Sequence, residues 1–191
     1  DFSMWDTYRC LHPLLTLLEP KRSLDMVKSL VMKAEQGGWM PIFPAWGNFT
    51  AAMIGDHVST MIYDAYVKGI TDFDTQMAYK YMRQNAFDSP TPDEYLDGKG
   101  RRALKSYLEY GYIPLEESVW QAFHKREQVS RTLEYAFDDF ALAQFAKGLG
   151  KISDYEALMK RSQNYRNVFD TKTNYVRGRH ADGSWIEPFD P

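Results

Sequence analysis

The sequence lacks the features that would place it in several common classes of protein. Cys10 is the only cysteine, so an internal disulfide is excluded and thiol content does not indicate a compartment. No run of about 18 apolar residues is available to span a membrane. No basic cluster interrupts a chain of net charge -3, so nucleic acid is not an expected partner. No His or Cys spacing fits a zinc site, and no glycine-rich phosphate loop is present.

Helical periodicity is what the sequence has in abundance. With 191 residues and 44% hydrophobic content, the chain has the size of one globular domain. Apolar residues recur at helical spacing between breaks of Gly, Pro and Asp. This pattern predicts longer helices over about residues 3–18, 23–37, 51–68, 71–86, 130–147 and 153–169. Residues 87–128 are predicted to form an irregular insertion with one short helix, and 170–191 a turn-rich tail.

The predicted helices alternate between two types. Those that begin near residues 3, 51 and 130 are apolar around most of their circumference, whereas the others are amphipathic. Such alternation is typical of αα-hairpins around an axis, each with an enclosed inner helix and a solvated outer one. Three hairpins make half of an (α/α)6 toroid, which would expose an apolar flank. The sequence therefore predicts an all-α partial toroid over residues 1–191, whose missing hairpins lie on a longer parent chain or in a separate fragment. A self-contained three-hairpin bundle or solenoid is the alternative.

The first predicted helix begins with a polar and aromatic cluster. Inner helices of a toroid direct one set of ends into the central cavity, where polar residues are candidates for binding. Asp6 and Arg9 are three residues apart on one helical face, beside Trp5. A carboxylate and a guanidinium that bond hydroxyls, with an indole under the ring, could clamp a sugar. Alternatively, Asp6 is a first-turn carboxylate that pairs with Arg9 and stabilises the helix.

A second cluster joins an aromatic, glycine-containing loop to the next inner helix. The loop offers Trp46, Gly47 and Asn48, and its glycine allows a ligand to approach the backbone closely. Asp56 and His57 follow, an acceptor beside a group that can donate or accept. All five are candidate sugar-binding residues. In the alternative interpretation, His57 is a core residue whose hydrogen bonds are satisfied by a nearby acid.

A third cluster lies on the helix predicted over residues 130–147. Glu134 and Asp138 are four residues apart and therefore neighbours on one face. Two carboxylates so placed could serve as a general acid and base. Like charges at this spacing repel, however, so they need a partner such as Arg131, a bound cation or a site. A salt-bridged helix face is the alternative.

Several ordered blocks carry a resemblance to a known family: Trp5-Asp6-Thr7-Tyr8-Arg9, His12-Pro13-Leu14-Leu15, Gly37-Gly38-Trp39, Gly47-Asn48, Met53-Ile54-Gly55-Asp56-His57, Asp64-Ala65-Tyr66, Thr132-Leu133-Glu134-Tyr135-Ala136, Arg179-His180-Ala181-Asp182-Gly183 and Pro188-Phe189-Asp190-Pro191. Each block is weak alone, but their joint order is specific. Over essentially its whole length the chain resembles glycoside hydrolase family 92, the calcium-dependent exo-acting α-mannosidases.

The resemblance implies a β-sandwich domain, absent here, packed on an (α/α)6 toroid with the active site between them. Such enzymes invert the anomeric configuration: a glutamic acid protonates the leaving oxygen, an aspartate activates water, and calcium binds two mannose hydroxyls. The acid, base and calcium segments of the family would all lie beyond Pro191. No catalytic or metal-binding residue is therefore expected within this chain, and calcium belongs to the parent enzyme.

By resemblance, Trp5, Asp6 and Arg9 contact the terminal sugar, with Asp56 and His57 as further candidates. Other acids become supporting residues, namely Glu134, Asp138 and Asp139. The parent would remove terminal mannose from N-glycans or mannan, in the periplasm, at the cell surface or outside a bacterium. Two rivals stay open: a non-catalytic αα-hairpin module that binds glycan or protein, and a six-hairpin glycosidase of another specificity.

Overall fold

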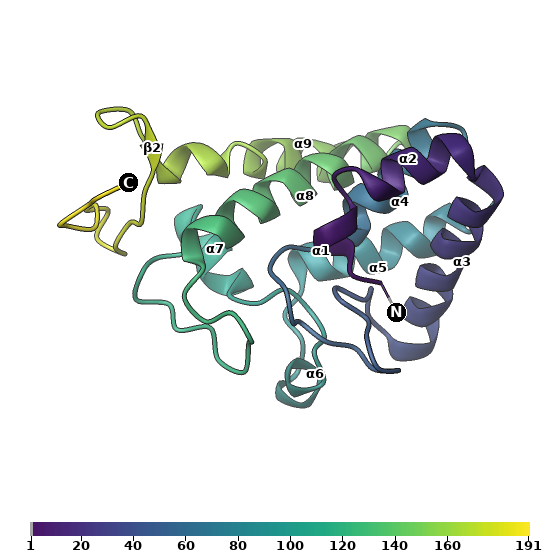
Figure 1. Cartoon of the computed structure of the whole chain (residues 1–191), viewed down its shortest axis with the longest axis horizontal. Coiled ribbons are helices and arrows are strands. Elements are labelled where there is room, and N and C mark those ends of the chain that lie inside the picture. The colour runs from purple at the N-terminus through teal and green to yellow at the C-terminus, as the bar shows by residue number, and fades with distance from the viewer. Residues whose placement is uncertain (1) are drawn as a thin grey trace.

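The computed structural model describes residues 2–191, and its regular structure is almost entirely helical (Figure 1). The elements are α1 (Met4–Thr7), α2 (Leu11–Leu18), α3 (Pro20–Gly37), α4 (Val58–Val67), α5 (Thr75–Phe87), α6 (Pro92–Leu96), α7 (Leu104–Tyr110), α8 (Gln128–Gly148), α9 (Ile152–Arg161), the 3-10 helix η1 (Asn164–Val168), β1 (Phe169–Asp170) and β2 (Tyr175–Val176). The two strands pair antiparallel, with Phe169 opposite Val176. The all-α prediction is confirmed. Within residues 2–191, no helix has both the length and the apolar character needed to cross a bilayer.

Consecutive helices pack as three pairs, α2 with α3, α4 with α5, and α8 with α9. These pairs correspond to the predicted hairpins. The long helix α8 is central, because it contacts α4 and α5 as well as α9, and Figure 1 shows it running through the middle of the molecule. The short helices α6 and α7 belong to the predicted insertion.

The main core contains fully buried side chains from several helices, among them Leu30 of α3, Ile62 of α4, Met82 of α5, Phe145 of α8 and Leu158 of α9. Burial of each such side chain is worth about 1.5–3 kcal/mol. A smaller cluster holds α7 against α8 and consists of Leu104, Tyr107, Ile113 and Tyr135. The helix α8, one of the three predicted inner helices, is thus packed on most sides.

The helix boundaries differ from the prediction in three places. The helix expected over residues 3–18 is divided into α1 and α2, and Pro20 opens α3 instead of separating two helices. Proline suits a first helical position, because its missing N–H would be unpaired there. The helix expected from residue 51 begins at Val58, since Gly55 before it has a φ of +87°. The last predicted helix ends at Arg161 and is followed by η1.

An apolar flank of the helical array is uncovered. On α8, Phe137 and Phe140 are 45% and 41% exposed, although the same helix buries its other faces. On α2, Leu14, Leu17 and Leu18 are exposed as well. The apolar flank expected of an incomplete ring is therefore present on both of these helices.

Candidate functional site

Arg9 follows α1 directly and is held in place by several contacts. Its guanidinium donates to the Trp5 carbonyl oxygen over 2.9 Å and to Glu134 Oε1 of α8 over 2.6 Å. It also lies over two aromatic rings, 4.4 Å from the Tyr8 centroid and 5.2 Å from the Trp5 centroid. Cation–π contacts and charge-assisted hydrogen bonds both restrict a long, flexible side chain. About half of the Arg9 side chain, 47%, nevertheless stays exposed.

Arg9 lines a cleft of about 390 Å³ between the first helices, α4 and α8. Its walls are Tyr8, Arg9, Pro13, Thr60, Asp64 and Phe137. The cleft therefore combines a cation, a carboxylate and an exposed aromatic ring. Such a mixture suits a polar ligand with an apolar face, which is the character of a hexose.

Behind Arg9, the Glu134 carboxylate joins the cleft to the interior. Tyr8 donates its hydroxyl to Glu134 Oε2 over 2.8 Å, and the Tyr8 ring stacks on the imidazole of His57 at 3.9 Å. The Nε2 atom of His57 lies 3.5 Å from Glu134 Oε2, and Nδ1 lies 2.9 Å from Asp138 Oδ1. A buried imidazole thus stands between two carboxylates.

The protonation of these groups follows from their surroundings. Burial disfavours a charged His57, but the charge and hydrogen bond of Asp138, aided by Glu134, outweigh burial and raise the His57 pKa. Burial raises the pKa of Tyr8, and its bond to Glu134 raises it further. Tyr8 is therefore a hydrogen-bond donor at every physiological pH.

Deeper still, a chain of buried ion pairs crosses the molecule. Asp138 accepts from the backbone N–H of Asp56 over 2.6 Å, and Asp56 in turn accepts from Arg101 over 2.9 Å. Arg101 also donates to Asp139 over 2.6 Å, as does Arg161. Burial opposes ionisation of Asp139, but the two arginines hold its pKa below the usual range.

The predicted residues of the first and third clusters meet in this arrangement, with partners that differ from those expected. Arg9 pairs with Glu134 rather than with Asp6, whose side chain is exposed on α1. Glu134 in turn is not paired with Arg131, which donates to the carbonyl oxygen of His124. The carboxylate that bonds the Nδ1 atom of His57 is Asp138.

Asp56 and His57 lie in the interior, 0% and 2% exposed. Asp56 bonds Arg101 and Asn85, and His57 bonds Asp138. Because neither side chain reaches the surface of the cleft, they differ from the expected sugar contacts. Their place in the structure is behind Glu134, where they support it.

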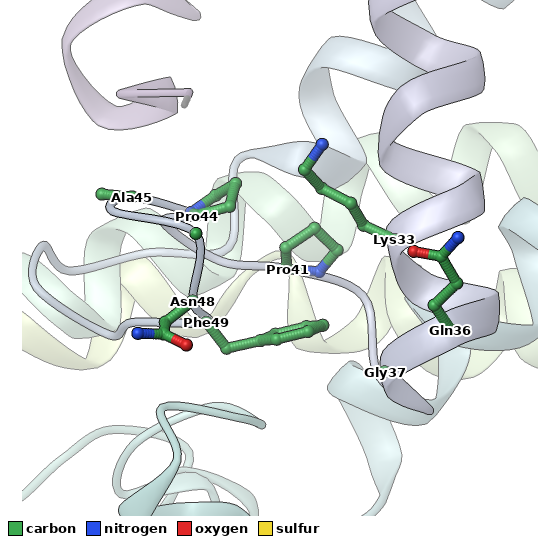
Figure 2. A pocket seen from close by; sticks show the side chains of 9 residues that line it. Lys33, Gln36, Gly37, Pro41, Pro44, Ala45, Asn48 and Phe49 are labelled. Atoms are coloured by element: carbon green, nitrogen blue, oxygen red, sulfur yellow. The ribbon is translucent and has the colours of Figure 1, made fainter.

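Trp46, Gly47 and Asn48 form an exposed turn in a different part of the molecule. Trp46 is 80% exposed and has a φ of +55°, and the bridge between Ala45 and Asn48 closes the turn. Gly47 and Asn48 line a second cleft of about 310 Å³ against the end of α3. Figure 2 shows Lys33 and Gln36 of that helix on one side and Pro41, Pro44 and Phe49 on the other.

Residues 1–191 match the glycosyl hydrolase family 92 catalytic domain. The chain belongs to this family. The family that the ordered motifs resembled is thus confirmed.

Solved structures of family 92 share the fold of this chain. A GH92 α-mannosidase from Bacteroides thetaiotaomicron, in complex with mannoimidazole, is 36% identical with a TM-score of 0.85, covering 100% of this chain and 23% of its own. A GH92 inverting mannosidase from Bacteroides thetaiotaomicron VPI-5482 is 30% identical with a TM-score of 0.87, and the match covers 99% of this chain and 24% of that one. A protein described as an uncharacterized secreted glycosidase, from Arthroderma benhamiae, is 31% identical over 94% of this chain and 23% of its own length. This family 92 chain thus spans about a quarter of these relatives.

Among residues 2–191, no three His, Cys, Asp or Glu side chains are grouped so that they could hold a metal ion. Asp138 and Asp139, the adjacent acids of α8, are occupied by backbone N–H, imidazole and guanidinium donors.

Some supporting residues of the family 92 site carry no recognisable signal in the sequence. Arg101 lies in the segment interpreted as an irregular insertion, yet it is 1% exposed and bridges Asp56 to Asp139. A Gly-Arg-Arg sequence gives no periodicity that would place it in a core. The signal that could have pointed to Arg101 was the acids Asp56 and Asp139, because carboxylates that are buried require cationic or N–H partners.

Replacing Gly55 with alanine should destabilise the protein more than the same change at Gly69. Both glycines have a φ of +87°, so both variants bear the left-handed backbone cost of about 1–2 kcal/mol. At Gly69 a Cβ meets open space, whereas at Gly55 it would lie within the ring of His57. That ring is fixed by Asp138 and Tyr8, so we expect an additional loss of about 1–3 kcal/mol in chemical denaturation. Equal losses would show that the ring moves aside freely.

The raised pKa of His57 should make stability depend on pH. Since the folded value exceeds the unfolded value of about 6.5, the stabilisation is complete below that pH and is lost as pH rises through the folded value. The thermal midpoint should therefore decline as the pH rises from about 6.5 through the folded value, and the decline should be smaller in His57→Gln, which retains a donor for Asp138. The measurement is a thermal melt of both proteins from about pH 5.5 to 9. The same slope in both would assign the decline to other groups.

Proposed function

We propose that this chain is part of the helical catalytic domain of an exo-acting α-mannosidase and contributes binding groups for the terminal mannose. The observation that carries the proposal is the Arg9 guanidinium, fixed at the edge of a cleft and still half exposed. Trp5, Asp6 and Arg9 are the proposed sugar contacts. Support comes from the similarity to a GH92 α-mannosidase solved with mannoimidazole.

We propose that the catalytic acid and base lie in other parts of the parent enzyme. The carboxylates near the cleft are already engaged: Glu134 by Arg9 and Tyr8, and Asp64 by Lys68 at 2.7 Å. An inverting mechanism needs a protonated acid and a separate base that holds a water molecule. We propose that both, together with calcium, come from residues outside this chain. One structural relative is itself described as an inverting mannosidase.

The proposed partner of the exposed apolar flank is the remaining helical part of the same polypeptide. Phe137 and Phe140 of α8 face outward beside a groove of about 370 Å³ that also includes Leu133 and Tyr165. Aromatic side chains of an inner helix are more stable when buried, so further hairpins packed here would remove this surface from water. The short span relative to the relatives supports this partner.

The proposed substrate and location follow the relatives. We propose terminal α-linked mannose of N-glycans or mannan as the substrate. We also propose action outside the cytoplasm, secreted, at the cell surface or in a bacterial periplasm. The relative described as a secreted glycosidase supports an extracytoplasmic site of action.

Substitution of Asp6 with alanine in the complete enzyme should weaken catalysis of mannoside hydrolysis by about tenfold to a hundredfold. This range corresponds to the loss of a hydrogen bond that involves a charged group, about 1.5–3 kcal/mol. The assay is kcat/KM on α-linked manno-disaccharides, with and without a chelator, and Asp25→Ala on the exposed face of α3 is the matched control. Activity that ignores both the chelator and the Asp6 substitution would contradict the proposal.

Substitution of Phe140 with serine should lower the thermal midpoint of the complete enzyme. If further hairpins cover this flank, the change removes a buried aromatic side chain, which typically costs about 3–5 kcal/mol. Ile152→Ser is the control, because Ile152 is similarly exposed, 53% against 41%, but lies at the start of the outer helix α9. Equal and small shifts in the two variants would mean that Phe140 faces water in the parent.

A further inference from the structure

Glu134 occupies an unusual position for a carboxylate. It lies on the innermost helix with only 14% of its side chain exposed, and Asp138, four residues later, is also acidic. Both Glu134 oxygens bond residues of the segment after α1: Oε1 accepts from Arg9 and Oε2 from Tyr8. The carboxylate thus links the first segment of the chain to α8, which is 125 residues away in sequence.

Arg9 depends on this link for its direction. Its other hydrogen bond is to the carbonyl oxygen of Trp5 in the short helix α1, four residues earlier in the chain, so that contact cannot place the guanidinium relative to α4 and α8. The bond to Glu134, at 2.6 Å, is the hydrogen bond that ties the guanidinium to α8, the helix that also supplies Phe137 to the cleft. Without it, rotation about the flexible stem would spread the guanidinium over several positions, a loss of order that a ligand would have to restore.

Glu134 is itself supported from behind. His57 Nε2 is buried, has no hydrogen-bond partner among residues 2–191, and lies 3.5 Å from Glu134 Oε2. The titratable groups that face His57 are Glu134 and Asp138 of α8, Tyr8 after α1, and Asp56 before α4. The imidazole lies between the two α8 acids, so a positive charge on it, favoured by its raised pKa, reduces their mutual repulsion.

We propose that Glu134 is a positioning residue that acts on the sugar only through Arg9. It does not touch the mannose, but it fixes the guanidinium that does. This inference rests on the proposed function, because it assumes that Arg9 contacts the substrate. Since a fixed donor stabilises ground state and transition state alike, loss of Glu134 should raise KM much more than it lowers kcat.

A double-mutant cycle in the complete enzyme tests this inference, with p-nitrophenyl α-mannoside as the substrate. The variants are Glu134→Gln, Arg9→Ala and the two combined. We expect Glu134→Gln to raise KM about tenfold with kcat nearly unchanged. In the Arg9→Ala background the same substitution should have almost no effect, because its target is gone. Glu156→Gln, at an exposed position of α9, is the matched control.

The outcomes separate this inference from the proposed function. If Arg9→Ala leaves kcat/KM unchanged, Arg9 does not contact the sugar and both fail. If Arg9→Ala lowers kcat/KM but Glu134→Gln keeps its full effect in that background, only the positioning role is overturned. Should Glu134→Gln fail to fold, as judged by its thermal midpoint, Glu134→Asp replaces it in the cycle. The shorter charged side chain should then raise KM by a smaller factor, again only when Arg9 is present.

Discussion

Two adjacent buried carboxylates on α8, Asp138 and Asp139, set the conditions that the rest of the structure meets. Both are 0% exposed, and a buried charge is tolerated only where partners replace its water. Asp139 forms ion pairs with Arg101 of the insertion and with Arg161 at the end of α9, and these pairs hold both segments against α8. Asp138 accepts a hydrogen bond from the backbone N–H of Asp56, just before α4, and also bonds the ring of His57. Removal of one partner from such a pair typically costs about 3–5 kcal/mol, so these contacts strongly favour one packing of the helices.

The rigidity of the cleft depends on these buried contacts of α8. Asp138 bonds His57, His57 lies against Glu134, and Glu134 bonds Arg9 over 2.6 Å. The position of Arg9 therefore depends on that of Asp138. Each step joins charged or hydrogen-bonded groups, and those behind Arg9 have low exposure, where electrostatic interactions are stronger than in water. A short first helix of four residues, α1, could not orient a guanidinium by itself. The long inner helix α8, through Glu134, fixes the orientation that α1 alone cannot fix.

The sequence was most informative where periodicity or chemistry left few choices. Hairpin pairing followed from alternating apolar and amphipathic helices, and the ordered motifs identified the family. The breaks were harder, because Pro20 reads equally as a stop and as a first helical residue, and only packing decides between them. In the site, Glu134 and Asp138 were visible as acids in need of partners. Arg101 was not, since its role depends on how the irregular segment folds back, which no local pattern encodes. Asp56 and His57 were recognised, but their burial was not.

The same charges explain why the proposed site favours binding over chemistry on this side of the cleft. A general acid must carry a proton that it can release, and a general base must hold a water molecule in reach of the anomeric carbon. Glu134 accepts hydrogen bonds from Arg9 and Tyr8, Asp64 is paired with Lys68, and Asp138 is enclosed. Each of these carboxylates already has donors that compete with a proton or a water molecule. The wall built by this chain is thus suited to fixing donors around a sugar, and a mannosidase that uses it requires acid and base groups from the facing side.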